Sequence, residues 1–332
     1  MSQIILGRTG GGVPSSGSAI SYLLFLKSHR DVMASLSIII PTRSFAPIDL
    51  VRELQRECSC APECDDYEII VTDDGTSPSD LPAECQLIHT FDHTRFLPHE
   101  RHQGKAALLN DAIGKARYDL LLFVDNDARL HSPGFISRYL QAAEQYPQTV
   151  ICGGVFTSVR SLTPHNTLRY RYECAANRQR QSQRQNRAPY SRFTTFNVLM
   201  PRDVVCRIPF NESIRRYGYE DVVMGLELLR HAVPVVHIDN ALVHTGIDSN
   251  SSFLQKTETA LQVLSQLPAA YQGGVTLVKM LQRLESLHLV GFIRLWHRLF
   301  HGLERANLLS RHPSLLLFRL YKLGYYLELT KS

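Results

Sequence analysis

The first indication of how this 332-residue chain folds comes from residues 120–127, which read LLLFVDND. Five apolar residues without polar alternation predict a strand that is buried on both faces, as in a parallel sheet. Ligands of such sheets bind where the strands end, and two acids stand at that point. Side chains two residues apart on an extended chain point the same way, so Asp125 and Asp127 are predicted to converge. Two convergent carboxylates suit a hard divalent cation and, through it, a phosphate-bearing ligand.

Strand-like and helix-like segments alternate on the N-terminal side of this motif. Helices are predicted at residues 48–58 and 104–116, and the predicted strands are 37–40, which Pro41 ends, 67–71, 86–90 and 120–124. Such alternation is typical of an α/β domain with a parallel sheet.

Three of the predicted strands end in polar residues. These ends read Pro41-Thr42-Arg43, Asp73-Asp74-Gly75 and Asp125-Asn126-Asp127. Because the tips of parallel strands share one edge of a sheet, we expect the three ends to meet there.

The second half of the chain has a different pattern. Strands are predicted at 151–156, 196–200 and 233–238 and a helix at 222–231, and the sequence is helical, apolar and basic from about residue 261. Such terminal helices either lie on a membrane surface or pack as an appendage or an oligomer contact. We therefore divide the chain into a poorly ordered leader (1–35), a main α/β domain (36–265) and a helical basic and aromatic extension (266–332).

Composition is that of a globular protein, with 44% hydrophobic and 20% charged residues. No apolar stretch reaches the roughly 18–20 residues of a transmembrane helix. Seven cysteines without paired spacing favour reduced thiols in a cytoplasm over a disulfide framework or a zinc site. Seven arginines between residues 169 and 192 carry much of the net charge of +5. They indicate either a contact with phosphates or nucleic acid, or a solvated segment.

Two further polar motifs lie downstream. Glu220 and Asp221 open the helix predicted at 222–231, where acids favour the helix dipole. They would equally serve as a general base, because burial or a neighbouring acid raises the pKa of a carboxyl towards working pH. His244 ends another apolar segment and becomes a candidate ligand if a metal binds nearby.

Taken in order, these motifs resemble family 2 glycosyltransferases, which have the GT-A fold, a Rossmann-like mixed sheet flanked by helices that binds nucleotide-diphospho-sugars. The resemblance covers about residues 36–265 and is carried by Pro41-Thr42, Asp73-Asp74-Gly75, Gly104-Lys105 with Asn110, Asp125-Asn126-Asp127, Glu220-Asp221 and His244. The segments 152–154, 193–197 and 237–240 also resemble bacterial members of the family.

The resemblance implies a set of donor-binding residues. Pro41, Thr42 and Arg43 would line the nucleotide pocket, and Asp73 or Asp74 would hydrogen-bond the base, with uracil favoured. Lys105, which follows Gly104, or the neighbouring Arg101 would contact the nucleotide. Asp125 would face the ribose or the donor sugar, with Asn126 beside it.

The resemblance also implies a metal and an acceptor site. Asp127 would bind Mn²⁺ or Mg²⁺ at the diphosphate, with His244 as a further ligand. Asp221 would deprotonate the acceptor hydroxyl with support from Glu220, and displacement at the anomeric carbon would invert its configuration.

The expected enzyme is thus a hexosyl- or N-acetylhexosaminyl-transferase of polysaccharide synthesis, which takes a nucleotide-sugar donor, a UDP-sugar being favoured, and a glycan or lipid-linked acceptor. We expect a cytoplasmic protein, with peripheral contact to the inner face of the plasma membrane left open, and no nucleic-acid partner. The sequence leaves the oligomeric state open.

The alternative is a nucleotidyltransferase or another metal-dependent, phosphate-processing α/β enzyme. A nucleotidyltransferase is expected to carry a Gly-rich basic loop after its first strand, where this chain has Pro41-Thr42-Arg43-Ser44. A haloacid-dehalogenase-like phosphatase prefers Thr or Val where Arg129 stands, and a dehydrogenase needs its Gly-rich fingerprint after a strand. The arginine-rich stretch 169–192 falls where glycosyltransferases often carry a mobile acceptor loop, and we expect it to close over donor phosphate or an anionic acceptor.

Overall fold

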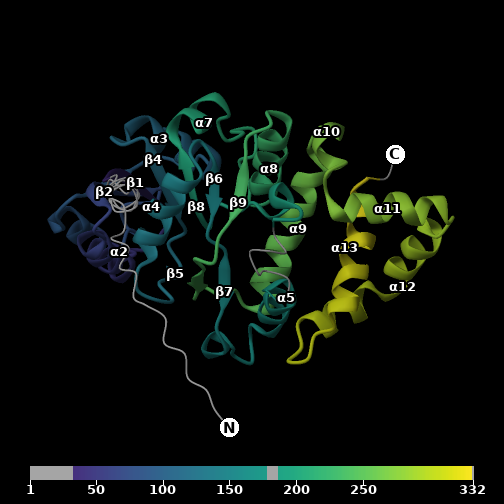
Figure 1. Ribbon diagram of the computed structural model, residues 1–332. Helices are drawn as coiled ribbons and strands as arrows, with labels where there is room; N and C mark the ends of the chain where they lie inside the picture. The colour runs from purple at the N-terminus through teal and green to yellow at the C-terminus, as the bar shows by residue number, and fades with distance from the viewer. Residues whose placement is uncertain (1–32, 178–185, 331–332) are drawn as a thin grey trace, which may run out of the picture. The chain divides into compact units, whose positions relative to one another are not determined.

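The computed structural model describes residues 33–177 and 186–330, and the part from Ala34 onward is one compact unit (Figure 1). Of the leader predicted at 1–35, residues 1–32 lie outside the described residues. The main sheet has the strand order β3-β2-β1-β4-β8-β6-β9. Its strands are β1 (Ala34–Thr42), β2 (Cys64–Asp73), β3 (Thr94–Pro98), β4 (Leu120–Val124), β6 (Val150–Cys152), β8 (Asn197–Pro201) and β9 (Val235–His237).

The sheet is mixed, as the resemblance implied. Strands β1 to β4 are parallel to one another, whereas β8 runs antiparallel to both β4 and β6. Since β2, β1 and β4 are neighbours, the three polar strand ends lie on one edge of the sheet, which confirms that expectation.

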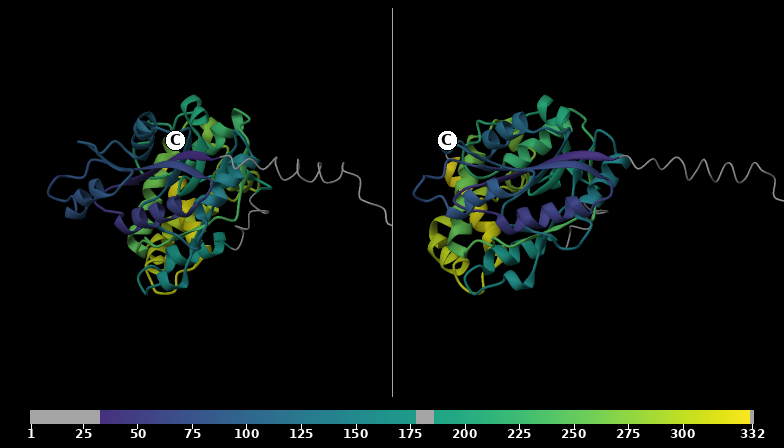
Figure 2. Two further views of the ribbon diagram at one scale, coloured as in Figure 1. Left: turned by 60° about the vertical axis from the view of Figure 1, so that its left-hand side comes forward. Right: turned by 90° about the vertical axis from the view of Figure 1, so that its left-hand side faces the viewer.

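Helices cover both faces of this sheet (Figure 2). Along β4, Leu122 and Val124 pack with α2 (Ile48–Cys60) and α4 (Phe135–Gln145). The alternate residues Leu121 and Phe123 pack with α3 (Lys105–Lys115), α7 (Arg202–Arg207) and α8 (Glu220–Arg230). Burial on both sides explains why the strand sequence is continuously apolar.

A second, smaller sheet has the order β5-β10-β7, and its strands are β5 (Ala128–Arg129), β7 (Val155–Thr157) and β10 (Leu242–His244). The strand predicted at 151–156 is therefore wrong as one element, because it is split between the two sheets at Gly153 and Gly154. Gly154 has a φ of +89°, which favours glycine. A Cβ on Gly153 would lie 2.4 Å from the hydroxyl oxygen of Tyr139.

Asn197 joins segments that are far apart in the sequence, at the place where the two sheets meet. Its side chain is fully buried and accepts a hydrogen bond from the Tyr139 hydroxyl at 2.7 Å. Its amide nitrogen donates to the carbonyl oxygens of Gly154 at 2.9 Å and Asn240 at 2.8 Å. The oxygen and the nitrogen of this buried amide thus both have hydrogen-bond partners, as burial requires.

Two predicted details near the N-terminus are wrong. Residues 86–90 belong to the 3-10 helix η1 (Ala83–Thr90), which buries only Cys85 and Ile88, a spacing of three that suits a helix. Pro41 does not end β1, which continues to Thr42. The pairing of β1 with β4 stops at Ile39, so Pro41 is paired with a strand on one side only, where a missing N–H is tolerated.

The C-terminal helices begin earlier than residue 261, at α9 (Asn250–Gln266). They continue as α10 (Ala269–Gln272), α11 (Thr276–Ser286), α12 (Val290–Leu308) and α13 (Leu315–Leu329). Helix α13 packs against α9 and against α5 (Thr167–Asn177), and α12 packs on α13, so that α13 lies between α9 and α12 (Figure 1). Among the described residues, no helix is both long and apolar enough to cross a membrane. All seven cysteines are free thiols.

Candidate active site

Lys105 and Asp125 meet at the tips of the central strands. Lys105 is the first residue of α3, and Asp125 directly follows β4. The lysine Nζ lies 2.6 Å from Asp125 Oδ1. Burial raises the pKa of Asp125, and Lys105 opposes this rise. Burial alone would lower the pKa of Lys105, but the nearby carboxylates of Asp125, Asp221 and Glu220 raise it above its usual value, so the lysine is a stable cation.

Asp127 and His244 are brought together by strand register. His244 pairs with Ala128, the residue after Asp127, across β5 and β10. The imidazole Nε2 lies 3.0 Å from Asp127 Oδ2, and Nδ1 lies 2.9 Å from Oε1 of Glu173 on α5. His244 therefore stands between two carboxylates. Burial alone would lower its pKa, but hydrogen bonding to Asp127 and Glu173 raises it to about 9.

Glu173 is itself held by several donors. It is buried and accepts hydrogen bonds from Arg169 Nε at 2.5 Å and from the Thr157 hydroxyl at 2.8 Å. Burial would raise the pKa of Glu173, but His244 and Arg169 lower it to about 2. Glu173 is thus a fixed anion that orients the imidazole of His244, the arrangement that supports histidine ligands in metal sites.

Close backbone packing fixes Asp127 on its other side. A Cβ on Gly246 would lie 2.4 Å from Asp127 Oδ2, so only glycine leaves room for the carboxylate here. Both the backbone N–H and the hydroxyl of Thr245 donate to the Asp127 carbonyl, at 2.9 and 2.7 Å.

Glu220 and Asp221 form the first turn of α8, as their sequence position predicted. The carboxylate oxygen Oδ1 of Asp221 accepts hydrogen bonds from the hydroxyl and the N–H of Thr195, at 2.7 and 3.2 Å. Glu220 accepts from the Gly218 N–H at 2.9 Å, and its pKa is raised by burial and by the charge of Asp221. Gly218 has a φ of +117°, and its missing Cβ would lie 2.5 Å from that of Ala260 on α9.

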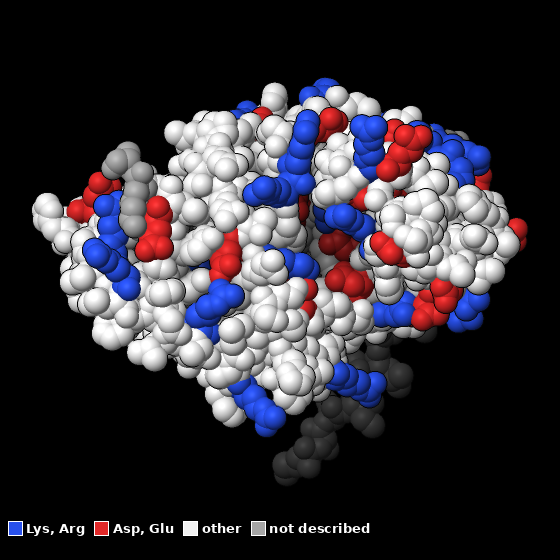
Figure 3. Space-filling model, turned by 180° about the vertical axis from the view of Figure 1, so that it is seen from behind, with Lys and Arg blue, Asp and Glu red and all other residues white. Residues whose placement is uncertain are grey.

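These groups line one cleft of about 540 Å³. Its acids are Asp125, Asp127, Glu173, Glu220, Asp221 and Asp248, and its cations are Lys105, Arg169, Lys256 and Lys322. Figure 3 shows a hollowed face with acidic side chains in the hollow and Lys and Arg side chains around it, a charge pattern like that of the cleft lining.

Apart from Lys105 and Asp125, the residues predicted to bind the donor lie at the same sheet edge but outside this cleft lining. The Thr42 hydroxyl accepts from the Asn126 amide at 3.0 Å, which links the ends of β1 and β4. Asp73 is buried and accepts from the N–H and the hydroxyl of Thr76 at 2.8 and 2.5 Å. Both carboxylate oxygens of Asp74 accept hydrogen bonds from the loop that leads to α3. This loop includes Gly104.

That loop is tightly packed. Asp74 accepts from His102 Nδ1 at 2.7 Å, from the Gln103 N–H at 2.8 Å and from the Gly104 N–H at 3.2 Å. Arg43 and Arg101 have exposed side chains near these strand ends, and Pro41 is half-buried. Of the described residues predicted to bind the donor, Lys105 and Asp125 reach the acidic cleft.

The arginine-rich stretch is divided by the structure. Arg169 and Arg171 belong to α5, where Arg169 pairs with Glu173 and Arg171 donates to the Pro313 carbonyl at 2.8 Å. Both are therefore engaged within the fold. Arg178, Arg180 and Arg184, on which the expected closing loop depends, lie outside the described residues.

The sequence pattern did not single out several residues that line the cleft or bond its side chains. Glu173 was visible as the single acid among the arginines, but its sequence position gave no hint that it reaches His244. Thr195 lies in a segment that resembles the family, yet no role was assigned to it. Phe253, Lys256, Phe318 and Lys322 come from α9 and α13 and complete the cleft wall, a contribution that only tertiary packing reveals.

Comparison with known proteins places this geometry in a family. The family model described as Glycosyl transferase family 2 matches residues 37–222. No curated protein matches the sequence. Among solved structures, a mannosyltransferase of Pyrobaculum calidifontis in complex with GDP-Man and Mn²⁺ is 14% identical, with a TM-score of 0.51 over 77% of this chain and 75% of that chain. TarS of S. aureus is 15% identical, with a TM-score of 0.45 over 72% of this chain and 41% of that chain. The family model spans more than half of the sequence, and the chain belongs to glycosyl transferase family 2.

Proposed function

We propose that this nucleotide-sugar-dependent glycosyltransferase is a metal-dependent enzyme that inverts the anomeric centre and takes a hydroxyl acceptor. The observation that carries the proposal is the cleft itself. It presents the pair Asp127 and His244 together with Asp221, a carboxylate held by Thr195, while Lys105 and Asp125 lie at the strand ends. One site thus contains candidate ligands for a cation that binds the diphosphate, Asp127 and His244, and a separate candidate base for the acceptor, Asp221.

The residues of the cleft fit Mn²⁺ or Mg²⁺. Asp127 offers a carboxylate oxygen, and His244 would offer Nε2 once a bound cation displaces the proton that its raised pKa holds there, with the ring oriented by Glu173. Within the part of the chain that the structure describes, no three His, Cys, Asp or Glu side chains form a closed metal cage. A site with two protein ligands suits a cation that takes its other ligands from substrate phosphates and water. When bound, such an ion would supply Lewis-acid stabilisation to the departing diphosphate.

The base assignment follows from contacts. In the proposed reaction Asp221 accepts the proton of the acceptor hydroxyl. The oxygen of that hydroxyl forms a bond to the anomeric carbon of the donor. The bond from that carbon to the diphosphate oxygen breaks, and its electron pair leaves with the nucleoside diphosphate. Thr195 fixes the Asp221 carboxylate through Oδ1, and Glu220 lies beside it and helps to place the acceptor.

The donor side is assigned to the strand ends. We propose that Asp73 or Asp74 accepts an N–H of the base, with uracil favoured, and that Pro41, Thr42 and Arg43 line the pocket. Arg101, Gly104 and Lys105 would lie along the nucleotide, and Asp125 with Asn126 would face the ribose or the sugar. The many loop contacts of Asp73 and Asp74 support a preformed pocket, which lowers the ordering cost of binding.

The acceptor side is assigned to two tyrosine–lysine pairs. Lys322 Nζ lies 5.2 Å from the ring centre of Tyr172, and Lys256 Nζ lies 5.5 Å from that of Tyr217. Both tyrosines line the cleft and are partly exposed. Aromatic faces suit sugar rings and the lysines suit anionic groups, so we propose a glycan or lipid-linked acceptor. The transferred unit is proposed to be a hexose or an N-acetylhexosamine.

A binding screen tests the donor proposal. Thermal unfolding would be followed with UDP, GDP and dTDP, each with Mn²⁺, with Mg²⁺ and with EDTA. We expect UDP to stabilise the protein in a metal-dependent way, whereas the mannosyltransferase with GDP-Man makes GDP the chief competitor. Asp127→Ala should abolish the metal dependence. Stabilisation by none of the three nucleotides would overturn the proposal.

A further inference from the structure

The outward side of α12 is unusually apolar. Phe292, Leu295, Leu299 and Leu303 are 61%, 54%, 64% and 69% exposed. Their spacing of three and four residues places them on one side of the helix. The opposite side carries Ile293 and other buried residues that face the protein. A row of large apolar side chains, each more than half exposed, is a common mark of an interaction surface.

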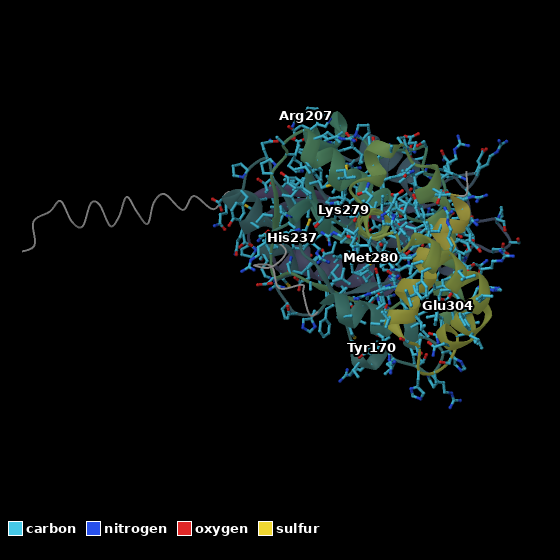
Figure 4. All side chains as sticks on the ribbon, turned by 90° about the vertical axis from the view of Figure 1, so that its right-hand side faces the viewer. Tyr170, Arg207, His237, Lys279, Met280 and Glu304 are labelled. Atoms are coloured by element: carbon cyan, nitrogen blue, oxygen red, sulfur yellow. The ribbon has the colours of Figure 1, made fainter. Side chains whose placement is uncertain are left out.

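Further exposed apolar residues lie on the preceding helix and turn. Leu287 and Leu289, in the turn between α11 and α12, are 64% and 42% exposed, and Met280 on α11 is 46% exposed. Figure 4 shows the side of the molecule formed by the C-terminal helices, with Met280, Lys279 and Glu304 labelled. We give the name α12 face to seven apolar residues: Met280, Leu287, Leu289, Phe292, Leu295, Leu299 and Leu303.

The exposed charges around the α12 face are mostly positive. Arg294 and Arg298 flank the apolar row on α12, and Lys279 and Arg283 lie on α11; all four are exposed. Helices α11 and α12 together carry two acids, Glu285 and the buried Glu304, against five Lys and Arg residues, so they have a positive excess. An apolar row bordered by cations is complementary to a surface with an apolar interior and anionic head groups.

The exposure of this row is not the result of a loosely attached helix. Glu304 is buried, and it accepts hydrogen bonds from Trp296 Nε1 at 2.8 Å and lies 2.7 Å from His297 Nδ1. His297 packs directly over Gly324 of α13, where a Cβ would lie 2.3 Å from the imidazole. The bonds within α12 hold His297 in place, and the packing of His297 on Gly324 fixes the rotation of α12 against α13, so the apolar row is held outward.

We propose that the α12 face docks on the surface of an anionic lipid bilayer, with α12 lying in the plane of the head groups. The apolar side chains would enter the acyl boundary, and the arginines would bind lipid phosphates. Helix α13 carries α12 on one side and contributes Phe318 and Lys322 to the cleft on the other. Docking would therefore hold the cleft close to head groups, which suits the lipid-linked form of the proposed acceptor, although docking itself does not depend on that assignment.

Vesicle flotation tests this proposal with the full chain. Vesicles of phosphatidylcholine alone would be compared with vesicles of phosphatidylcholine and phosphatidylglycerol. We expect binding to the anionic vesicles that weakens with salt, and much weaker binding to the neutral ones. Leu295→Ser with Leu299→Ser should abolish binding to both. Arg294→Gln with Arg298→Gln should weaken binding to anionic vesicles roughly 30-fold and leave neutral vesicles unaffected.

Matched controls separate docking from misfolding. Leu87→Ser removes a similarly exposed leucine elsewhere, and Arg56→Gln with Arg207→Gln removes two exposed arginines from other helices. These variants should bind vesicles as the wild type does. Every variant should keep its circular dichroism and its stabilisation by UDP with Mn²⁺, so that a failure of the donor assignment is seen separately. The proposal is overturned if the wild type does not float with anionic vesicles, or if light scattering shows a dimer that the two leucine substitutions convert to a monomer.

Discussion

Glu173 gives the sharpest test of the metal assignment. It contacts the proposed ligand His244 but is not itself proposed to bind the metal. Glu173→Gln keeps the shape of the side chain and removes its charge. The amide oxygen still accepts from one neighbour, and the Thr157 hydroxyl is able to turn and accept from the new NH₂ group. The change therefore weakens the hold on His244 without emptying the site.

The magnitude follows from two charge-assisted contacts, those with His244 Nδ1 at 2.9 Å and Arg169 Nε at 2.5 Å. A hydrogen bond to a charged group contributes about 1.5–3 kcal/mol and a neutral one about 0.5–1.5 kcal/mol, so each contact loses about 1 kcal/mol. We expect Mn²⁺ affinity to fall by about 1 to 2 kcal/mol, or roughly 5- to 30-fold. Losses of about 10- to 100-fold are typical when the partner of a histidine ligand is removed.

The assay is a Mn²⁺ titration followed by electron paramagnetic resonance in the presence of UDP. Asp248→Asn is the matched control, since it removes a carboxylate from the same cleft that pairs with Lys256 and not with His244. Equal Mn²⁺ affinity in wild type and Glu173→Gln would refute the reasoning. An equal loss in Asp248→Asn would show that the general negative charge of the cleft, and not the orientation of His244, sets the affinity.

Three further outcomes are expected. Asp221→Asn should leave UDP binding unchanged in calorimetry and lower transfer to a true acceptor by about 10²- to 10⁴-fold; normal turnover would rule out Asp221 as the base. In the folded protein the pKa of Glu220 is raised by burial and by Asp221. Its ionised form therefore costs stability above the folded pKa and costs none below the unfolded value of about 4.3. Glu220→Gln should accordingly raise the melting temperature at neutral pH, with the gain vanishing towards about pH 4, and a constant gain at all pH values would contradict this. Gly246→Ala should displace the Asp127 carboxylate, whose oxygen lies 2.4 Å from the new Cβ, and should weaken Mn²⁺ binding as Asp127→Ala does; unchanged binding would show that Asp127 is not a ligand.

The sequence predicted best what depends on short-range pattern. The apolar run at 120–124 gave the buried central strand, and the acids after it gave the correct edge of the sheet, because strand burial and strand ends are local properties. The helical residues 86–90 show the limit of that approach. A segment of five residues of mixed character fits the repeat of a helix as well as that of a strand. Packing against the sheet decides between the two.

What the sequence could not predict depends on distant contacts. Glu173 reaches His244 across 71 residues, and Lys322 reaches the cleft from α13, well outside the segment that resembles the family. No spacing rule connects such positions, since each pairing is set by how helices pack on the finished sheet. The sequence offered His244 only as a candidate ligand, whereas the register of β10 against β5 explains physically how it comes to lie beside Asp127.

The contacts of Asn197 carry a consequence for the order of folding. The side chain closes loops of 58 residues to Tyr139 and 43 residues to both Gly154 and Asn240. Closure over such separations is slow and requires most of the chain, whereas the parallel strands β1 to β4 lie in an early, nearly continuous part of it. A nascent chain would thus assemble the strand ends assigned to the nucleotide first. Asp127 and His244, 117 residues apart, would join only when the last strand is in place, so a partly synthesised chain would lack the paired metal ligands.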